Sequence, residues 1–108
     1  MANQFTSSMS KSIGTAPVSV YTATASSQTT LIGMTVANLT TAVVTADVYI
    51  TRAGVDYYIS KGFDIIPAST QILIGGDQKI VLQPSDIVKV VSNTATAVDV
   101  ILSMLIIT

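Results

Sequence analysis

The sequence predicts an all-β fold, a single-domain antiparallel β-sandwich or jelly roll of roughly eight strands. Val, Ile and Thr together make up 41 of the 108 residues, and these β-branched side chains favour strands. Glutamate, a good helix former, is absent, and no segment repeats apolar residues at helical spacing over three turns. Turn signals recur about every 8–12 residues, the spacing typical of sandwiches and jelly rolls.

The expected strands lie between Gly, Pro and Ser turn signals. Residues 1–12 belong either to a first strand, Phe5–Ile13, or to an extended N-terminal arm, because apolar residues are sparse there. The remaining expected strands are Val18–Tyr21, Thr30–Leu39, Val43–Thr51, Val55–Ser60, Phe63–Ile66, Gln71–Ile74, Lys79–Leu82, Ile87–Val91 and Ala97–Ile107. All of them fit into one domain spanning residues 1–108.

The sequence also predicts two hairpin turns and the inward and outward faces of one strand. Arg52-Ala53-Gly54 is typical of a tight hairpin, and Gly75-Gly76-Asp77 offers positive-φ positions for a second hairpin that returns through Lys79–Leu82. In the segment Thr30–Leu39, strict alternation places Leu31 on one face of the strand. The opposite face then carries Ile32, Met34, Val36 and Asn38.

The residue inventory argues against an enzyme. The chain has no cysteine and no histidine, which removes disulfides, the commonest zinc ligands and the commonest general base. The aspartates are dispersed over turns and polar strand faces, at Asp47, Asp56, Asp77, Asp86 and Asp99 among others. Gly75–Lys79 lacks the spacing of a phosphate-binding loop. We therefore expect no catalytic residue, no metal site and no cofactor.

Charge and hydropathy restrict the partners. Five basic residues are scattered along the chain, so no cluster could follow a phosphate backbone and nucleic-acid binding is disfavoured. No apolar run approaches the roughly 20 residues that span a bilayer, and the polar first residues do not form the apolar region of a signal peptide. We expect a chain made in a cytoplasm that does not insert into membranes.

The composition also predicts that the chain associates with copies of itself or with a larger partner. Only 10% of the residues are charged and 49% are hydrophobic, with a mean hydropathy of +0.62, whereas about a quarter of an ordinary soluble domain is charged. A small domain has a small core and buries a limited share of its surface. We therefore predict a homo-oligomer, or a chain covered by a larger partner.

The C-terminal strand is the best candidate for the interface. Its alternation gives one fully apolar set, Val98, Val100, Leu102, Met104 and Ile106. The opposite set includes Ile101, Leu105 and Ile107 and is also mostly apolar. One core cannot bury both sets, so we predict that Ile101, Leu105 and Ile107 contact a neighbouring subunit. The alternative is that the Met1–Ser12 arm covers this face within the same chain.

A second candidate surface involves two tyrosines. Tyr57 and Tyr58 are adjacent in an expected strand, so they point to opposite faces, and we expect one inside and the other exposed. Exposed aromatic rings on a β-surface are also used to contact sugars. This keeps a carbohydrate-binding module as an alternative.

The chain also resembles small structural proteins of tailed bacteriophages, including cyanophage-like ones. The resemblance is one of pattern and turn placement, and it runs through nearly the whole chain. It is carried by Ser12-Ile13-Gly14-Thr15, Val20-Tyr21-Thr22-Ala23, Ile32-Gly33-Met34-Thr35-Val36-Ala37-Asn38, Ile74-Gly75-Gly76-Asp77-Gln78-Lys79 and Val98-Asp99-Val100-Ile101-Leu102-Ser103.

The resemblance implies a virion protein without an enzymatic site. Its leading form is a capsid decoration or cement protein, a trimer at local threefold positions that contacts other virion proteins such as the major capsid protein. A neck or tail accessory protein is the alternative within the virion. A module that contacts host glycans through Tyr57 or Tyr58 is the alternative from a different class.

Overall fold

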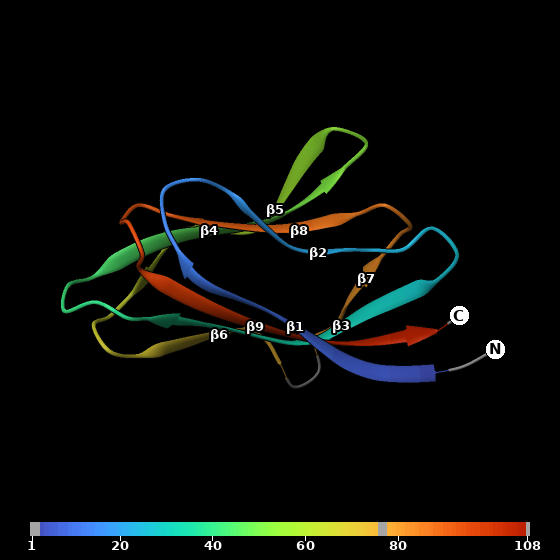
Figure 1. The fold of residues 1–108 in the computed structure, drawn as a ribbon, viewed down its shortest axis with the longest axis horizontal. Coiled ribbons are helices and arrows are strands. Elements are labelled where there is room, and N and C mark those ends of the chain that lie inside the picture. The colour runs from blue at the N-terminus through green and yellow to red at the C-terminus, as the bar shows by residue number, and fades with distance from the viewer. Residues whose placement is uncertain (1–2, 76–77, 108) are drawn as a thin grey trace.

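The computed structural model describes residues 3–75 and 78–107 and contains nine strands (Figure 1). No helix occurs in these ranges. The strands are β1 Asn3–Ile13, β2 Val18–Thr22, β3 Gln28–Asn38, β4 Val44–Arg52, β5 Val55–Ile65, β6 Thr70–Ile74, β7 Ile80–Leu82, β8 Ile87–Ser92 and β9 Val98–Ile107.

The strands form two facing antiparallel sheets, which confirms the all-β sandwich. Sheet A has the order β1-β9-β3-β6, with β7 also paired to β3, and sheet B has the order β2-β8-β4-β5. The pairings are nested, with β1 on β9, β2 on β8, β3 on β6 and β7, and β4 on β5. A long antiparallel ribbon rolled into two sheets gives this order, which is that of a jelly roll.

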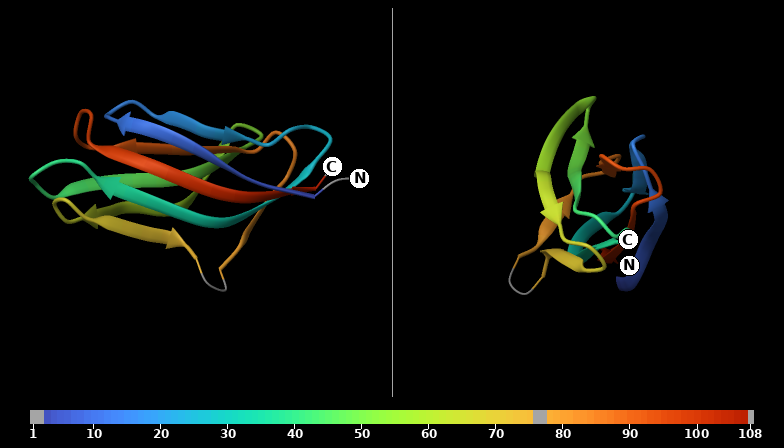
Figure 2. Two further views of the ribbon diagram at one scale, coloured as in Figure 1. Left: turned by 60° about the horizontal axis from the view of Figure 1, so that its bottom comes forward. Right: turned by 90° about the vertical axis from the view of Figure 1, so that its left-hand side faces the viewer.

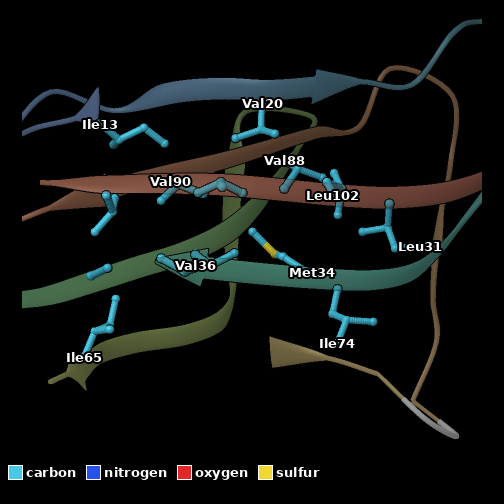
Figure 3. Close-up of a cluster of buried hydrophobic side chains, with 14 of the residues drawn as sticks. Ile13, Val20, Leu31, Met34, Val36, Ile65, Ile74, Val88, Val90 and Leu102 are labelled. Carbon is cyan, nitrogen blue, oxygen red and sulfur yellow. The ribbon is translucent and has the colours of Figure 1, made fainter. Parts of the chain in front are cut away.

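The core lies between the sheets and consists mainly of aliphatic side chains, 14 of which are drawn in Figure 3. Sheet A contributes side chains such as Leu31, Met34 and Leu102, and sheet B contributes Val88 and Val90, all of them buried. These side chains follow the two-residue alternation of their strands. The molecule measures 46 × 28 × 21 Å, and the start of β1 and the end of β9 lie together at one end, where Asn3 pairs with Ile107 (Figure 2).

The hairpin expected at Arg52-Ala53-Gly54 is present. Ala53 and Gly54 have φ values of 52° and 78°, and Arg52 pairs with Val55 across the turn. Two successive positive φ angles match the twist of the flanking strands.

The expected alternation of β3 is wrong at its centre. A bulge between Leu31 and Gly33 turns Leu31 inward, where it is fully buried together with Met34 and Val36. Ile32 is only half-buried. An extra residue in one strand reverses the face that later residues occupy.

The expected hairpin between Gln71–Ile74 and Lys79–Leu82 is also wrong. β6 pairs with residues 34–37 of β3, and β7 pairs with residues 29–31 of the same strand. β6 and β7 are therefore two pieces alongside one long strand rather than partners of each other. Of the proposed turn, Gly76 and Asp77 lie outside the described residues.

The expected strands Val55–Ser60 and Phe63–Ile66 form one strand, β5. Gly62 has a φ of 62° and lies in a stretch where the register with β4 shifts. Its N–H donates to Asp47 Oδ1 at 2.6 Å. Glycine here produces a bulge rather than an end to the strand, because it adopts positive φ without steric cost.

Residues 3–13 form the strand β1 at the edge of sheet A rather than a separate arm. The register shifts after Ser10, and Ser12 has a φ of 55°. Beyond this irregularity Ile13 enters the core, whereas Phe5 and Met9 face solvent. The Ser8 hydroxyl donates to Val20 O at 2.6 Å and so joins β1 to β2, the edge strand of the other sheet.

Candidate functional site

The outward side chains of β9 lie on the solvent face of sheet A. Val98, Val100, Leu102 and Met104 are fully buried. Ile101 is exposed, and Leu105 and Ile107 are half-buried. The structure therefore places the three predicted interface residues on the face that points away from the core.

Two apolar rows cross this face from one edge of the sheet to the other. In the first row Phe5 lies opposite Leu105, which lies opposite Thr30, which lies opposite Val81. In the second row the order is Met9, Ile101, Thr35 and Ile72. Side chains directly opposite one another across paired strands lie close enough to interact.

A row of small residues separates the two apolar rows. Ser7 lies opposite Ser103, and Ser103 lies opposite Gly33. The two rows are four positions apart along β1 and along β9, which is roughly 13 Å at 3.3 Å per residue. We call this surface the sheet A face and define it by Phe5, Met9, Ile72, Val81, Ile101, Leu105 and Ile107.

The sheet A face is uncovered by the described chain. Phe5 is 74% exposed, Ile72 67%, Met9 65%, Val81 56% and Ile101 46%. β1 pairs edge to edge with β9 and does not lie across its face. The intrachain cover considered from the sequence is therefore not formed by residues 3–12. A cluster of large exposed apolar side chains is typical of an interaction site.

Charge is distributed unequally between the sheets. The strands of sheet A carry two charged residues, Lys11 and Asp99. The strands of sheet B carry six, which are Asp47, Arg52, Asp56, Lys61, Asp64 and Lys89. The sheet A face therefore needs little charge desolvation when it is covered, since removing charges from water is the main cost of burying a polar surface.

A hollow of about 260 Å³ lies at one end of the second row. Its lining combines three apolar residues, Met9, Val100 and Ile101, with three polar ones, Ser10, Lys11 and Asp99. Asp99 Oδ1 accepts a hydrogen bond from the Ser12 N–H at 2.8 Å. Most of the exposed surface of the hollow is apolar, which suits it to receive a side chain from a partner.

The two tyrosines lie at the end of the β4–β5 hairpin. Tyr57 is 58% exposed and Tyr58 is 45% exposed, so the expectation that one packs inside is wrong. β5 is an edge strand with its hairpin end beyond the core (Figure 1). Tyr58 contacts Tyr49, with ring centroids 5.0 Å apart, and Lys61 Nζ lies 4.4 Å from the Tyr58 centroid. The pKa of the Tyr49 hydroxyl is raised, first by burial and then by the negative charge of nearby Asp56.

Both tyrosines line one groove of about 560 Å³. The opposite wall includes Leu73, Gln78 and Ile80. The groove thus combines two aromatic rings with an amide side chain, which is the composition that the glycan alternative requires.

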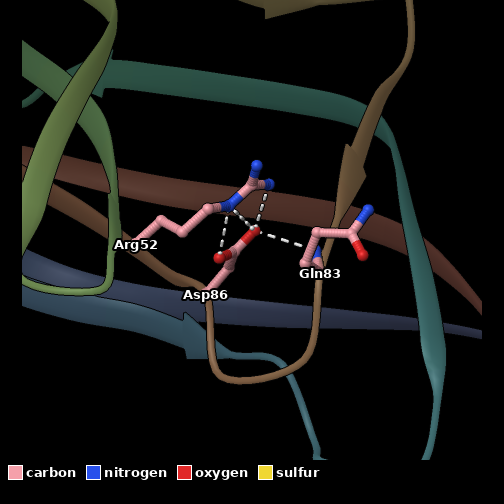
Figure 4. Close-up of polar contacts among 3 residues, drawn as sticks. All are labelled: Arg52, Gln83 and Asp86. Carbon is pink, nitrogen blue, oxygen red and sulfur yellow. Dashed lines mark hydrogen bonds and ion pairs between the residues drawn. The ribbon is translucent and has the colours of Figure 1, made fainter.

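Four of the described aspartates, Asp47, Asp56, Asp86 and Asp99, accept structural hydrogen bonds. Asp47 accepts from the Gly62 N–H, and Asp56 accepts from the Thr51 hydroxyl at 2.7 Å. Asp86 is buried and accepts two hydrogen bonds from Arg52 Nε and one from an Arg52 terminal nitrogen, at 2.6–3.2 Å (Figure 4). The Gln83 N–H also donates to it at 2.8 Å. Within residues 3–75 and 78–107, no three metal-ligating side chains of the His, Cys, Asp or Glu types cluster together.

Sequence reasoning missed four members of the sheet A face: Phe5, Met9, Ile72 and Val81. Their alignment with Ile101 and Leu105 depends on the pairing of β1 with β9, and the sequence does not contain that long-range pairing. A local signal exists in β1, where Phe5, Ser7 and Met9 share one face and Gln4, Thr6, Ser8 and Ser10 share the other. That pattern indicates a strand with its apolar side turned outward.

No protein-family model matches this sequence, and no curated protein matches it. The described part of the chain contains no helix long and apolar enough to cross a membrane.

Proposed function

We propose that this chain is a structural protein of a bacteriophage virion that decorates or cements the capsid by docking through the sheet A face. The observation that carries the proposal is this uncovered, charge-poor apolar face opposite a charged sheet. Such a division orients the molecule, with sheet A toward a partner and sheet B toward water. The resemblance to small phage structural proteins supports the same role.

The energetics suit a protein that acts by binding in many copies. Covering one large apolar side chain contributes about 1.5–3 kcal/mol, and the sheet A face presents seven such side chains, five of them strongly exposed. A partner that binds only the folded chain also stabilises it by mass action. Docking onto a shell therefore compensates for the limited core of a small domain.

The proposal includes a non-enzymatic role, a location in the virion, and contacts with copies of itself and with a shell protein such as the major capsid protein. The threefold arrangement belongs to the resemblance and stays a prediction. A neck or tail accessory protein would use the same kind of surface, so position in the particle distinguishes it from a decoration protein.

A cryo-EM map of the phage particle that encodes this chain tests the role directly. We expect copies of the jelly roll on the outer surface of the shell, with sheet A facing the capsid protein. Density at the neck or tail would favour the accessory role. A particle without this chain, or copies that turn the sheet A face to solvent, would contradict the proposal.

The second candidate is a glycan contact at the groove beside Tyr57 and Tyr58. The specific observation in its favour is that the structure brings both rings into one groove with Gln78. A glycan array probed with the full chain tests it, with Tyr57→Ala as the variant and Phe5→Ala as an exposed aromatic control. Binding that Tyr57→Ala abolishes and Phe5→Ala preserves supports this role, and an array without any bound glycan rejects it.

A further inference from the structure

β1 is the exposed edge of sheet A. It pairs with β9 along one side, and no described strand pairs with its other side. It runs for 11 residues and contains no proline. Alternate N–H and C=O groups of an edge strand point away from the sheet and are available to a further strand.

The other edges of the sandwich carry features that discourage pairing. β2 has five residues, follows Pro17 and has an irregular register with β8. β5 carries Lys61 and two aspartates and has the bulge at Gly62. β6 has five residues and begins three residues after Pro67. Short length, proline, charge and bulges are the devices that protect sheet edges, and residues 3–10 of β1 have none of them.

The side chains of β1 are arranged in an unusual way. Phe5 and Met9 point outward, whereas Gln4, Thr6, Ser8 and Ser10 lie on the inward side. The outward side thus carries apolar groups right up to the free edge of the sheet. A strand added to this edge would extend the sheet A face.

We propose that two copies of this chain pair through antiparallel β1 strands about a twofold axis at Ser7. In this register Ser7 of one copy faces Ser7 of the other, and Phe5 of one faces Met9 of the other. Aromatic and aliphatic side chains placed directly across from one another stabilise strand pairing. A twofold interface uses the same surface on both copies, and the β1 sequence is self-complementary about Ser7.

Neighbouring registers fit less well. A shift by one residue would place the outward side chains of one copy against the inward side chains of the other. A shift of the axis by one position in either direction places Phe5 opposite Ser7 or opposite Lys11. Only the axis at Ser7 pairs the two large apolar side chains, and it places the single charge of β1, Lys11, opposite Asn3.

This pairing joins the apolar rows of the two copies. The row Ile72–Thr35–Ile101–Met9 of one copy would continue into Phe5–Leu105–Thr30–Val81 of the other. Phe5 of the second copy would lie beside the hollow lined by Met9 and Ile101. The dimer would carry one sheet A face of double width.

The inference does not depend on the virion role, since this dimer would form in solution whether or not a capsid is present. It competes with the trimer that the resemblance implies. Sedimentation equilibrium of the full chain should give twice the chain mass of 11.2 kDa. Ser7→Lys and Ser7→Asp should each give a monomer, because like charges would face one another at the axis. An equimolar mixture of the two variants should restore the mass of two copies.

Ser26→Lys, an exposed serine in the loop before β3, is the matched control and should keep the dimer. Circular dichroism should show an intact β-signal for all variants, because Ser7 is exposed. A wild-type monomer, a mass of three copies, or a dimer that persists in both Ser7 variants would overturn the proposal. Two monomeric variants that do not associate when mixed would also overturn it.

Discussion

The buried carboxylate of Asp86 connects three parts of the sandwich. It lies in the turn before β8, pairs with Arg52 at the end of β4, and accepts from the backbone N–H of Gln83 after β7. The hydrogen bonds from Arg52, followed by the one from Gln83, hold the pKa of Asp86 below its ordinary value, although burial acts in the opposite direction. The ionised form is therefore the one that the fold stabilises.

This contact predicts a dependence of stability on pH. A lowered folded-state pKa adds stability that is complete above the unfolded aspartate pKa, about 4, and disappears as the pH falls through the folded-state value. The free energy of unfolding should therefore fall below about pH 4. Asp86→Asn and Arg52→Met should both flatten this fall, measured by urea denaturation across the acid range. Variants with the wild-type pH dependence would show that Asp86 is not responsible.

A second buried polar residue, Asn38, fixes the end of β3. Its side-chain nitrogen donates to the carbonyls of Ala42 and Ile65, at 2.8 and 2.9 Å, and its oxygen accepts from the Thr40 N–H at 2.8 Å. The sequence placed Asn38 on the same face as Met34 and Val36, and all three residues are buried. The partners come from a loop and from β5, so the sequence alone did not predict them.

Asn38→Asp tests these donor bonds. Aspartate keeps the acceptor and loses the donor, which leaves buried carbonyls without a partner, so we expect a loss of about 1–3 kcal/mol in the free energy of unfolding. Asn93→Asp is the matched control, because Asn93 is exposed and the hydrogen bonds of its side chain run through the oxygen, which aspartate retains. That oxygen accepts from the Thr45 N–H and the Thr94 hydroxyl. Equal losses in the two variants would contradict this assignment.

At the scale of the strand, the sequence predicted the buried and exposed faces correctly where a strand has no bulge. β9 keeps one alternation throughout, and its inward and outward sets were predicted correctly. β3 and β1 each contain an irregularity, at Leu31–Gly33 and after Ser10, so a single alternation assigned Leu31 to the wrong face. A bulge depends on the partner strand as well as on the local residues, and a single sequence does not reveal the partner.

The bulge at Gly62 gives a prediction for a strand. Gly62→Ala should destabilise the fold by about 1–2 kcal/mol, because its φ of 62° is unfavourable for a residue with a Cβ. Gly33→Ala is the control within a strand, since its added Cβ would meet the Ser103 side chain at 3.7 Å and the Ile74 carbonyl oxygen at 4.0 Å, both ordinary contacts. Thermal unfolding of both variants measures the difference. A stable Gly62→Ala variant would mean that the bulge relaxes without strain.

At the scale of the whole molecule, the nested strand order brings the two ends of the chain together. β1 and β9 lie side by side although nearly the whole chain separates them. This arrangement assembles the sheet A face from both ends. The sequence predicted the fold class, because alternation and turn chemistry are local properties. It predicted only the β9 part of the face, because the remainder depends on which strands become neighbours.

The central claim is that the sheet A face is the docking surface, and co-sedimentation with purified phage particles tests it most directly. Leu105→Lys introduces a charge into the first apolar row, and Leu39→Lys makes the same change at an exposed loop leucine. The wild-type chain and Leu39→Lys should sediment with the particles. Leu105→Lys should bind at least about tenfold more weakly while keeping its β-signal in circular dichroism. Equal binding of Leu105→Lys and wild type would contradict the claim.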